Sequence, residues 1–168
     1  MSSQKRRVVS HREALRFAFD SLTTQGVSGP DAKTTAEGLV DADLCGVDTH
    51  GIQRIPIYCQ RLKLGLISAA PRISVDNITP VCVHIDGDDG LGFVVATKAV
   101  EAATDRAKDF GFAISGIKHS THFGMARFQD TLATIQKHNL INRPRQLAMQ
   151  ARNVHHVNRT PQTQPDGH

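Results

Sequence analysis

The hydrophobic pattern of this chain of 168 residues changes its period near Pro71, and this change restricts the possible fold more than any other feature. Before Pro71, apolar residues recur at intervals of three and four, which predicts helices. After Pro71, short runs rich in β-branched residues alternate between apolar and polar positions, which predicts strands, and an alanine-rich helical run separates them. We therefore expect an α/β protein with a helical segment over residues 1–70 and a mixed α/β segment over residues 71–141.

The first two helices carry start and stop signals. Ser10 and Glu13 have the spacing of a capping box, and Gly26 is the expected end of the helix that follows. Ser28, with a proline and an acid in the next turn, begins a second helix, and Gly46 is its expected C-terminal glycine.

A third helix is expected to begin at Asp48 or Thr49 and to run to about Leu64. Pro56 lies inside this run. Because proline lacks the N–H of a helical hydrogen bond and its ring clashes with the preceding turn, we expect a kink at this position.

The pattern after Pro71 predicts strand, strand, helix, strand and helix, in this order. The expected ranges are 72–75, 81–85, 93–109, 112–117 and about 125–139. A cluster of Asp and Gly at 86–90 predicts a turn between the second strand and the first of these helices. A polar loop, residues 119–124, is expected to connect the last strand to the last helix.

Residues 142–168 are poor in apolar side chains and rich in Gln, Asn, Arg and Pro. Such a composition cannot bury enough surface to offset the entropy of ordering, so we expect a disordered tail. The formal net charge of the chain is +4, and most of this excess comes from four arginines in the tail. The body is therefore close to neutral, which argues against a nucleic-acid-binding face.

The remaining composition indicates a protein of the cytoplasm. No apolar run approaches the about 20 residues of a membrane span, and no apolar segment of a secretory signal follows the basic N-terminus. Cys45, Cys59 and Cys82 are widely spaced and lie outside any CxxC pattern, which predicts free thiols in a reducing compartment.

The first candidate site is the pair His50 and Arg54. On the expected third helix these residues are four apart and project from one face. An arginine can hold a carboxylate with two parallel hydrogen bonds, and a histidine is the usual proton donor near neutral pH. The pair therefore fits protonation of a carbonyl beside an anchored carboxylate, whereas the alternative is a solvated pair without a role.

The second candidate site is the polar loop at residues 119–124. Ligands of α/β proteins commonly bind where strands end, and the N-terminus of the following helix suits a phosphate. Gly124 would permit a close approach of the backbone. The alternatives are a structural turn and a metal site built from His119, His122 and His50, although no carboxylate lies near this histidine pair in the sequence.

The third candidate is the segment of residues 86–92, which reads DGDDGLG. It resembles the opening of a calcium loop, but Gly90 and Thr97 stand where that loop has ligands. Its glycines also miss the order of a dinucleotide-binding loop. We expect a plain turn in which Asp86 or Asp88 bonds to the backbone.

Taken together, the three segments resemble those of the type-2 malate/L-lactate dehydrogenase family. Residues 41–54, DADLCGVDTHGIQR, are similar to the family stretch ADLRG-VDSHG-xxR, and Tyr58 and Gly65 follow at similar positions. The segment at 86–92 is similar to the DGDNGLG of the family, and GIKHSTHFG at 116–124 is similar to its strand-end loop. The resemblance extends over about residues 13–141 and excludes the tail.

The resemblance implies a fold that is specific to the family and is not a Rossmann fold. His50 matches the proton donor of the family, and Thr49 stands where a serine usually relays to that histidine. Arg54 matches the arginine that holds the substrate carboxylate. The residues that match a loop touching the cofactor are His122, Phe123, Gly124 and Met125.

The activity implied is transfer of a hydride between NAD or NADP and a small 2-oxo or 2-hydroxy acid such as malate or lactate, or a cyclic imino acid, by a homodimer. Family members run to about twice this length, and residues 142–168 hold no counterpart of their catalytic aspartate or of most cofactor contacts. The sequence therefore predicts a truncated oxidoreductase. The alternative is a catalytically inactive binding or dimerisation module. We expect no metal, no membrane and no nucleic acid among the partners.

Overall fold

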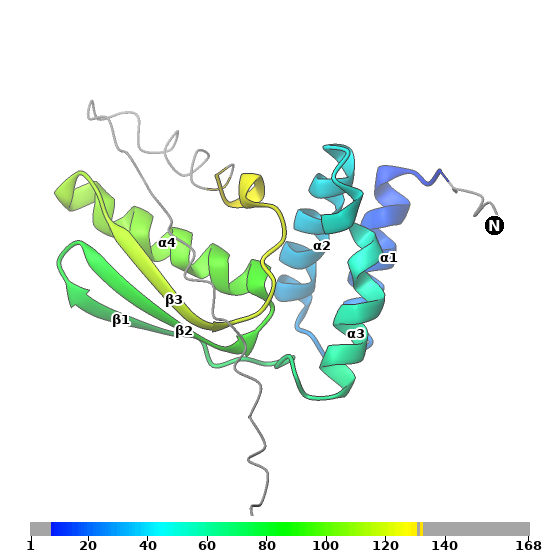
Figure 1. Ribbon diagram of the computed structural model, residues 1–168, viewed down its shortest axis with the longest axis horizontal. Coiled ribbons are helices and arrows are strands. Elements are labelled where there is room, and N and C mark those ends of the chain that lie inside the picture. The colour runs from blue at the N-terminus through cyan, green and yellow to red at the C-terminus, as the bar shows by residue number, and fades with distance from the viewer. Residues whose placement is uncertain (1–7, 131, 133–168) are drawn as a thin grey trace, which may run out of the picture.

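The computed structural model of the chain describes residues 8–130 and residue 132. Three helices lie beside a three-stranded sheet that is backed by a fourth helix (Figure 1). The elements are α1 (His11–Thr23), α2 (Gly29–Leu44), α3 (Ile55–Lys63), β1 (Ser74–Thr79), β2 (Cys82–Gly90), α4 (Gly92–Phe110) and β3 (Ile114–Ser120). This architecture confirms the α/β prediction. The division at residue 70 into two domains stays a prediction.

The first two helices begin and end where the sequence predicts. The Ser10 N–H donates to the Glu13 carboxylate over 2.9 Å, and the Glu13 N–H donates to Ser10 Oγ over 3.3 Å, so the capping box of α1 is complete. Ser28 Oγ caps α2 in the same way. Gly26 and Gly46 follow the two helices with φ of +87° and +74°, a conformation that glycine adopts without strain.

The expectation of one kinked helix from Asp48 to Leu64 is wrong. Two short 3₁₀ turns, η1 (Asp48–His50) and η2 (Ile52–Arg54), precede α3, which begins at Ile55. Pro56 lies in the first turn of α3, where an N–H has no partner within the helix. Proline is therefore tolerated there and starts the helix instead of kinking it.

The sheet has the order β1-β2-β3, with β1 antiparallel and β3 parallel to β2. The crossover between the parallel strands is α4, which packs on one face of the sheet through Val95 and Ala99 against Val83 and Ile85. The expected turn at 86–90 is instead the end of β2, which continues to Gly90 with a shift of register against β3.

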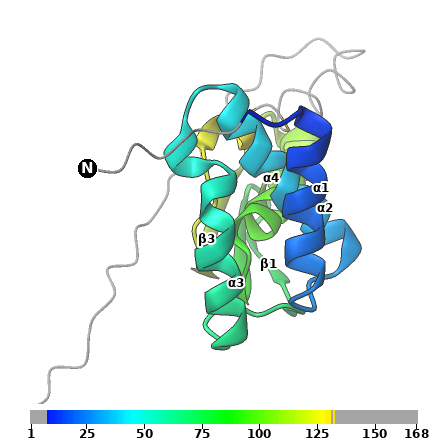
Figure 2. The same cartoon turned by 90° about the vertical axis from the view of Figure 1, so that its right-hand side faces the viewer.

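The largest apolar cluster joins the helices to the start of α4. Phe93 of α4 is fully buried, and a Cβ at either Gly38 of α2 or Gly124 after β3 would overlap its ring. Phe128 packs edge-on against the same ring, with centroids 5.9 Å apart. Figure 2 shows α1, α2 and α3 in front of the sheet. These contacts bring the segment after β3 to the helices.

The last expected helix begins at Ala126, and residues 126–130 are helical. Residue 132 is helical as well, whereas the remainder of the range predicted for this helix and the tail at 142–168 lie outside the described residues. Within the part of the chain that the structure describes, no helix is long and apolar enough to cross a membrane.

Candidate functional site

The turn between α2 and α3 carries three of the predicted site residues. Thr49 Oγ1 lies 3.0 Å from His50 Nδ1. Arg54 Nε donates to the Thr49 carbonyl over 2.6 Å, so its side chain folds back toward His50. Because η1 and η2 are separate 3₁₀ turns, the two residues do not share a helix face as the sequence suggested; the Arg54–Thr49 hydrogen bond holds them together instead.

The loop after β3 brings His122 to this turn. The rings of His50 and His122 have centroids 5.3 Å apart. On its other side, His122 Nδ1 lies 2.7 Å from the hydroxyl of Tyr58, which projects from α3. Residues that are distant in the sequence thus form one cluster of two imidazoles, a phenol and the guanidinium of Arg54.

The loop is held by the N-terminus of α4. Thr121 Oγ1 accepts the N–H of Gly92 over 3.0 Å and donates to the carbonyl of Gly90 over 3.0 Å. Gly124 has φ of +78° and lies against the Phe93 ring. Of the neighbours of His122, Gly124 is buried, whereas Phe123 and Met125 are half-buried.

Burial sets the protonation of the cluster. It raises the pKa of Tyr58 to about 12, against the smaller opposing effects of Arg54 and Arg61. Burial also lowers the pKa of His122, and the positive charges of Arg54, His50 and Arg61 act in the same direction. At neutral pH a protonated phenol therefore faces a neutral imidazole, and the tautomer of the ring sets which of the two groups donates in their hydrogen bond.

The sequence did not predict that Tyr58 lies in the site. It indicated only that this residue matches a tyrosine of the family. Tyr58 is the only tyrosine of the chain. It also lies four residues after Arg54, one helical turn along the same face, and this spacing is the signal that could have identified it.

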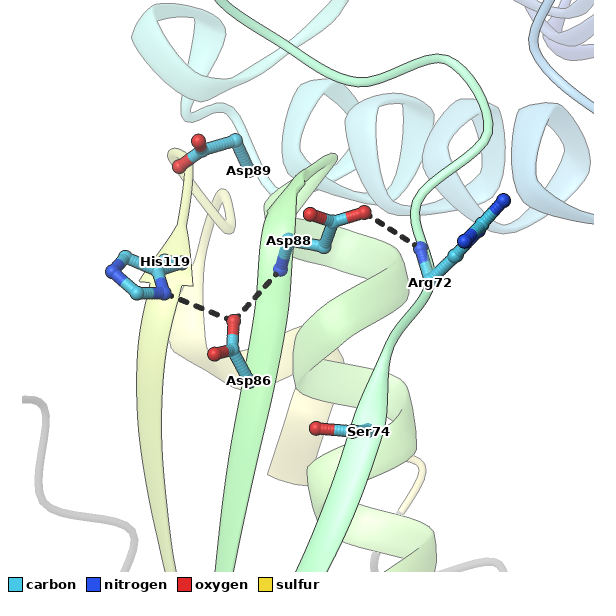
Figure 3. Close-up of a pocket in the computed structure, with 6 residues that line it drawn as sticks. All are labelled: Arg72, Ser74, Asp86, Asp88, Asp89 and His119. Atoms are coloured by element: carbon cyan, nitrogen blue, oxygen red, sulfur yellow. Dashed lines mark hydrogen bonds and ion pairs between the residues drawn. The ribbon is translucent and has the colours of Figure 1, made fainter.

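A second polar cluster lies at the end of β2 and β3 (Figure 3). His119 Nδ1 is 3.0 Å from Asp86 Oδ1, and Lys118 Nζ is 3.2 Å from Asp86 Oδ2. The Asp88 N–H donates to Asp86 Oδ1 and the Arg72 N–H donates to Asp88 Oδ2, which confirms the predicted bonding of these aspartates to the backbone.

Hydrogen bonding lowers the pKa of Asp86 to about 2, with the Asp88 N–H as the largest cause and His119 as the second. A cavity of about 460 Å³ opens beside this cluster. His119 faces Asp86 and His122 faces Tyr58, so the two histidines of the predicted loop have separate partners. Among the described residues, no three His, Cys, Asp or Glu side chains are placed to share a metal ion.

The cluster around His50 and His122 combines a proton donor with a group that can hold an anion. Arg54 uses Nε for the Thr49 carbonyl, and its two terminal nitrogens present the planar fork that suits a carboxylate. A histidine such as His50 beside this fork can protonate an oxygen next to a bound carboxylate. This chemistry fits reduction of a carbonyl.

Comparison with known proteins gives consistent results. A family model described as malate/L-lactate dehydrogenase matches residues 9–141. The L-sulfolactate dehydrogenase of Methanocaldococcus jannaschii is 43% identical over 121 residues, which are 72% of this chain and 35% of that protein. The (2R)-3-sulfolactate dehydrogenase (NADP+) of Chromohalobacter salexigens is 32% identical over 120 residues, 71% of this chain and 36% of that protein.

A solved structure of the sulfolactate dehydrogenase from Methanocaldococcus jannaschii superimposes with a TM-score of 0.75 at 40% identity. The superposition covers 77% of this chain and 38% of that structure. The chain thus spans about a third of the length of the curated relatives that it matches.

Proposed function

This chain belongs to the malate/L-lactate dehydrogenase family, and from that premise we propose that it carries the acid-binding and proton-donating part of an oxidoreductase acting on 2-hydroxy acids. The reaction is transfer of a hydride between a nicotinamide cofactor and a small 2-oxo or 2-hydroxy acid. The observation that carries this proposal is the convergence of His50, Arg54 and His122 from two distant segments.

His50 is the proposed proton donor. Thr49 Oγ1 lies 3.0 Å from His50 Nδ1, and a hydroxyl can donate to this nitrogen in the neutral ring or accept its N–H in the protonated ring. Thr49 keeps the hydroxyl of the serine usual in the family, so the relay is retained with an added methyl group. Reduction of a ketone requires a proton at the oxygen. A protonated His50 ring supplies this proton and is left as a neutral imidazole.

Arg54 is proposed to hold the carboxylate of the substrate. Its anchored Nε fixes the plane of the guanidinium before the substrate arrives, which reduces the entropy lost on binding. Tyr58 and His122 lie beside the same group of side chains. Because the Arg54 side chain is bonded to the residue before His50, an acid held by Arg54 would present its carbonyl oxygen near His50.

The residues present fit the nicotinamide end of the cofactor. The loop at His122–Met125 offers two half-buried apolar side chains and the half-buried ring of His122, and Gly124 lets this loop pack closely on Phe93. When bound, the nicotinamide supplies or accepts the hydride. The glycines of the described segment 86–92 miss the order of a dinucleotide-binding loop, so these four residues are proposed contacts for one end of NAD or NADP only.

For the complete protein we propose malate, lactate or a sulfonated analogue as the acid, and a homodimer in the cytoplasm. The names of the family and of its relatives support hydroxy acids of this size. A second candidate function is an inactive binding or dimerisation module.

A chimera separates the two functions. Residues 9–141 replace the corresponding part of the L-sulfolactate dehydrogenase from Methanocaldococcus jannaschii, and NADH oxidation is followed with 3-sulfopyruvate and with oxaloacetate. We expect turnover in the chimera and a loss of about 10²–10⁴ in kcat for His50→Ala, the usual size of a general-acid contribution. His11→Ala, an exposed histidine of α1, is the matched control and should leave kcat unchanged. Chimeras that fold without turnover, or a His50→Ala rate within threefold of the parent, would refute the proposal.

A further inference from the structure

Asp43 occupies an unfavourable position in its own helix. It is the second-last residue of α2, and the last turn of that helix holds Asp41 as well and no basic side chain. The C-terminal end of a helix carries a partial negative charge, so a carboxylate there destabilises the helix. Helix formation therefore gives no reason for an aspartate at position 43.

The carboxylate of Asp43 acts on the next element instead. Its Oδ2 accepts the N–H of Ile52 over 2.9 Å, and this hydrogen bond is partly buried. Ile52 is the first residue of η2, and no side chain of the preceding residue caps that turn. Asp43, nine residues upstream on another element, supplies the missing acceptor.

Gly51 lies in close contact with the same carboxylate. Its φ of −89° and ψ of −159° are extended, a conformation open to any residue, so the backbone does not require glycine here. A Cβ at this position would overlap the carboxyl group of Asp43. Glycine at position 51 therefore allows the Asp43 carboxyl group to lie directly against the backbone.

The residues fixed by this contact are the ones that flank Gly51. His50 is its direct neighbour, and the Arg54 N–H donates to the Gly51 carbonyl over 3.0 Å. The backbone positions of His50 and Arg54 are thus both tied to that of Gly51, one through the peptide bond and the other through this hydrogen bond. A shift of this backbone would change the distance between them.

We propose that Asp43 is a positioning residue: its carboxylate, bonded to the Ile52 N–H and packed on Gly51, sets the spacing of His50 and Arg54. The consequence for acid binding rests on the function proposed above. The contact itself does not, so the two can be tested separately.

The test is hydrogen–deuterium exchange with residue-level fragmentation on the full chain, together with binding of oxamate, a 2-oxo acid analogue. We compare Asp43→Ala, Asp43→Asn and, as a control of equal charge change at the same helix end, Asp41→Asn. Loss of a hydrogen bond to a charged acceptor should speed exchange at Ile52 about tenfold or more in Asp43→Ala. Asp43→Asn keeps an oxygen acceptor and should stay within threefold of the wild type, as should Asp41→Asn.

Exchange in α1 and the first turns of α2 should stay unchanged, which distinguishes positioning from general destabilisation. If Asp43→Ala does not fold, Gly51→Ala tests the same contact from the side of the glycine. Gly29→Ala is the control, because nothing lies within 4 Å of the Cβ position at Gly29. Exchange at Ile52 within twofold of the wild type in whichever of the two variants folds would overturn the proposal.

The binding arm expects oxamate to bind Asp43→Ala at least tenfold more weakly than the wild type, and Asp43→Asn within threefold. Equal Kd values for wild type and Asp43→Ala would overturn the positioning role. If Ile52 exchange accelerates in Asp43→Ala but oxamate does not bind the wild type, the positioning contact stands and the proposed function of the site fails.

Discussion

Gly124→Ala tests how the loop that carries His122 is seated. Gly124 has φ of +78°, and a Cβ would overlap the fully buried ring of Phe93. A left-handed φ costs an alanine about 1 kcal/mol relative to glycine. Overpacking against a ring that has no free space adds about 1–3 kcal/mol. We therefore expect the free energy of unfolding to fall by about 2–4 kcal/mol.

Gly111 provides the matched control for the backbone cost. Its φ is +85°, and nothing lies within 4 Å of the position of its Cβ. Gly111→Ala should therefore lower the free energy of unfolding by about 1 kcal/mol only. Urea unfolding at constant pH, followed by circular dichroism, gives both values from the midpoints at equal slope.

Phe93→Leu in the Gly124→Ala background should recover part of the loss, because the smaller side chain leaves room for the new methyl group. The coupling energy in this double-mutant cycle should be about 1 kcal/mol or more. Equal losses in Gly124→Ala and Gly111→Ala, within about 0.5 kcal/mol, would refute the packing argument. The loop would then have room to move away from Phe93.

Three further changes have expected outcomes. Arg54→Lys keeps the charge but loses the planar fork and the Nε donor, so the Kd of oxamate should rise about tenfold, and an unchanged Kd would place Arg54 outside the site. Because folding lowers the pKa of His122, this residue takes up a proton at higher pH in the unfolded chain than in the folded one. The free energy of unfolding should therefore fall as the pH drops below about 6.5. Urea midpoints measured at pH 7.5 and 5.5 should differ less in His122→Asn than in the wild type. His119→Ala should raise the pKa of Asp86 above about 2 while the Asp88 N–H still keeps it below 3.8, which a carboxyl ¹³C titration can measure; an unchanged midpoint would contradict the assigned contact.

Much of the candidate site could be predicted from the sequence because the motifs name residue types. The sequence offers His50 as a proton donor, Arg54 as the holder of an acid and His122 as part of the cofactor loop, and the structure brings these side chains together. What the motifs could not supply was the partner of each side chain. Thr49 and Arg54 find theirs within the folded turn, whereas Tyr58 meets its partner only after the loop following β3 has reached α3.

The beginnings of α1 and α2 were determined by the sequence alone. Ser10 and Glu13 are three residues apart and exchange hydrogen bonds without any help from the rest of the chain. Ser28 Oγ accepts the N–H of Asp31, which is likewise three residues along. Interactions of this kind form within one helical turn, so local sequence is sufficient to predict them.

The turn that carries His50 was decided by tertiary structure. In isolation, residues 48–64 read as one helix, but the Asp43 carboxylate takes the Ile52 N–H and packs on Gly51, and the helix begins only at Ile55. The pairing of Tyr58 with His122 likewise joins positions 64 residues apart. Such contacts depend on how α2, α3 and the loop after β3 are packed. A buried polar group bonds to whatever the fold brings within hydrogen-bond distance, which its neighbours in the sequence do not determine.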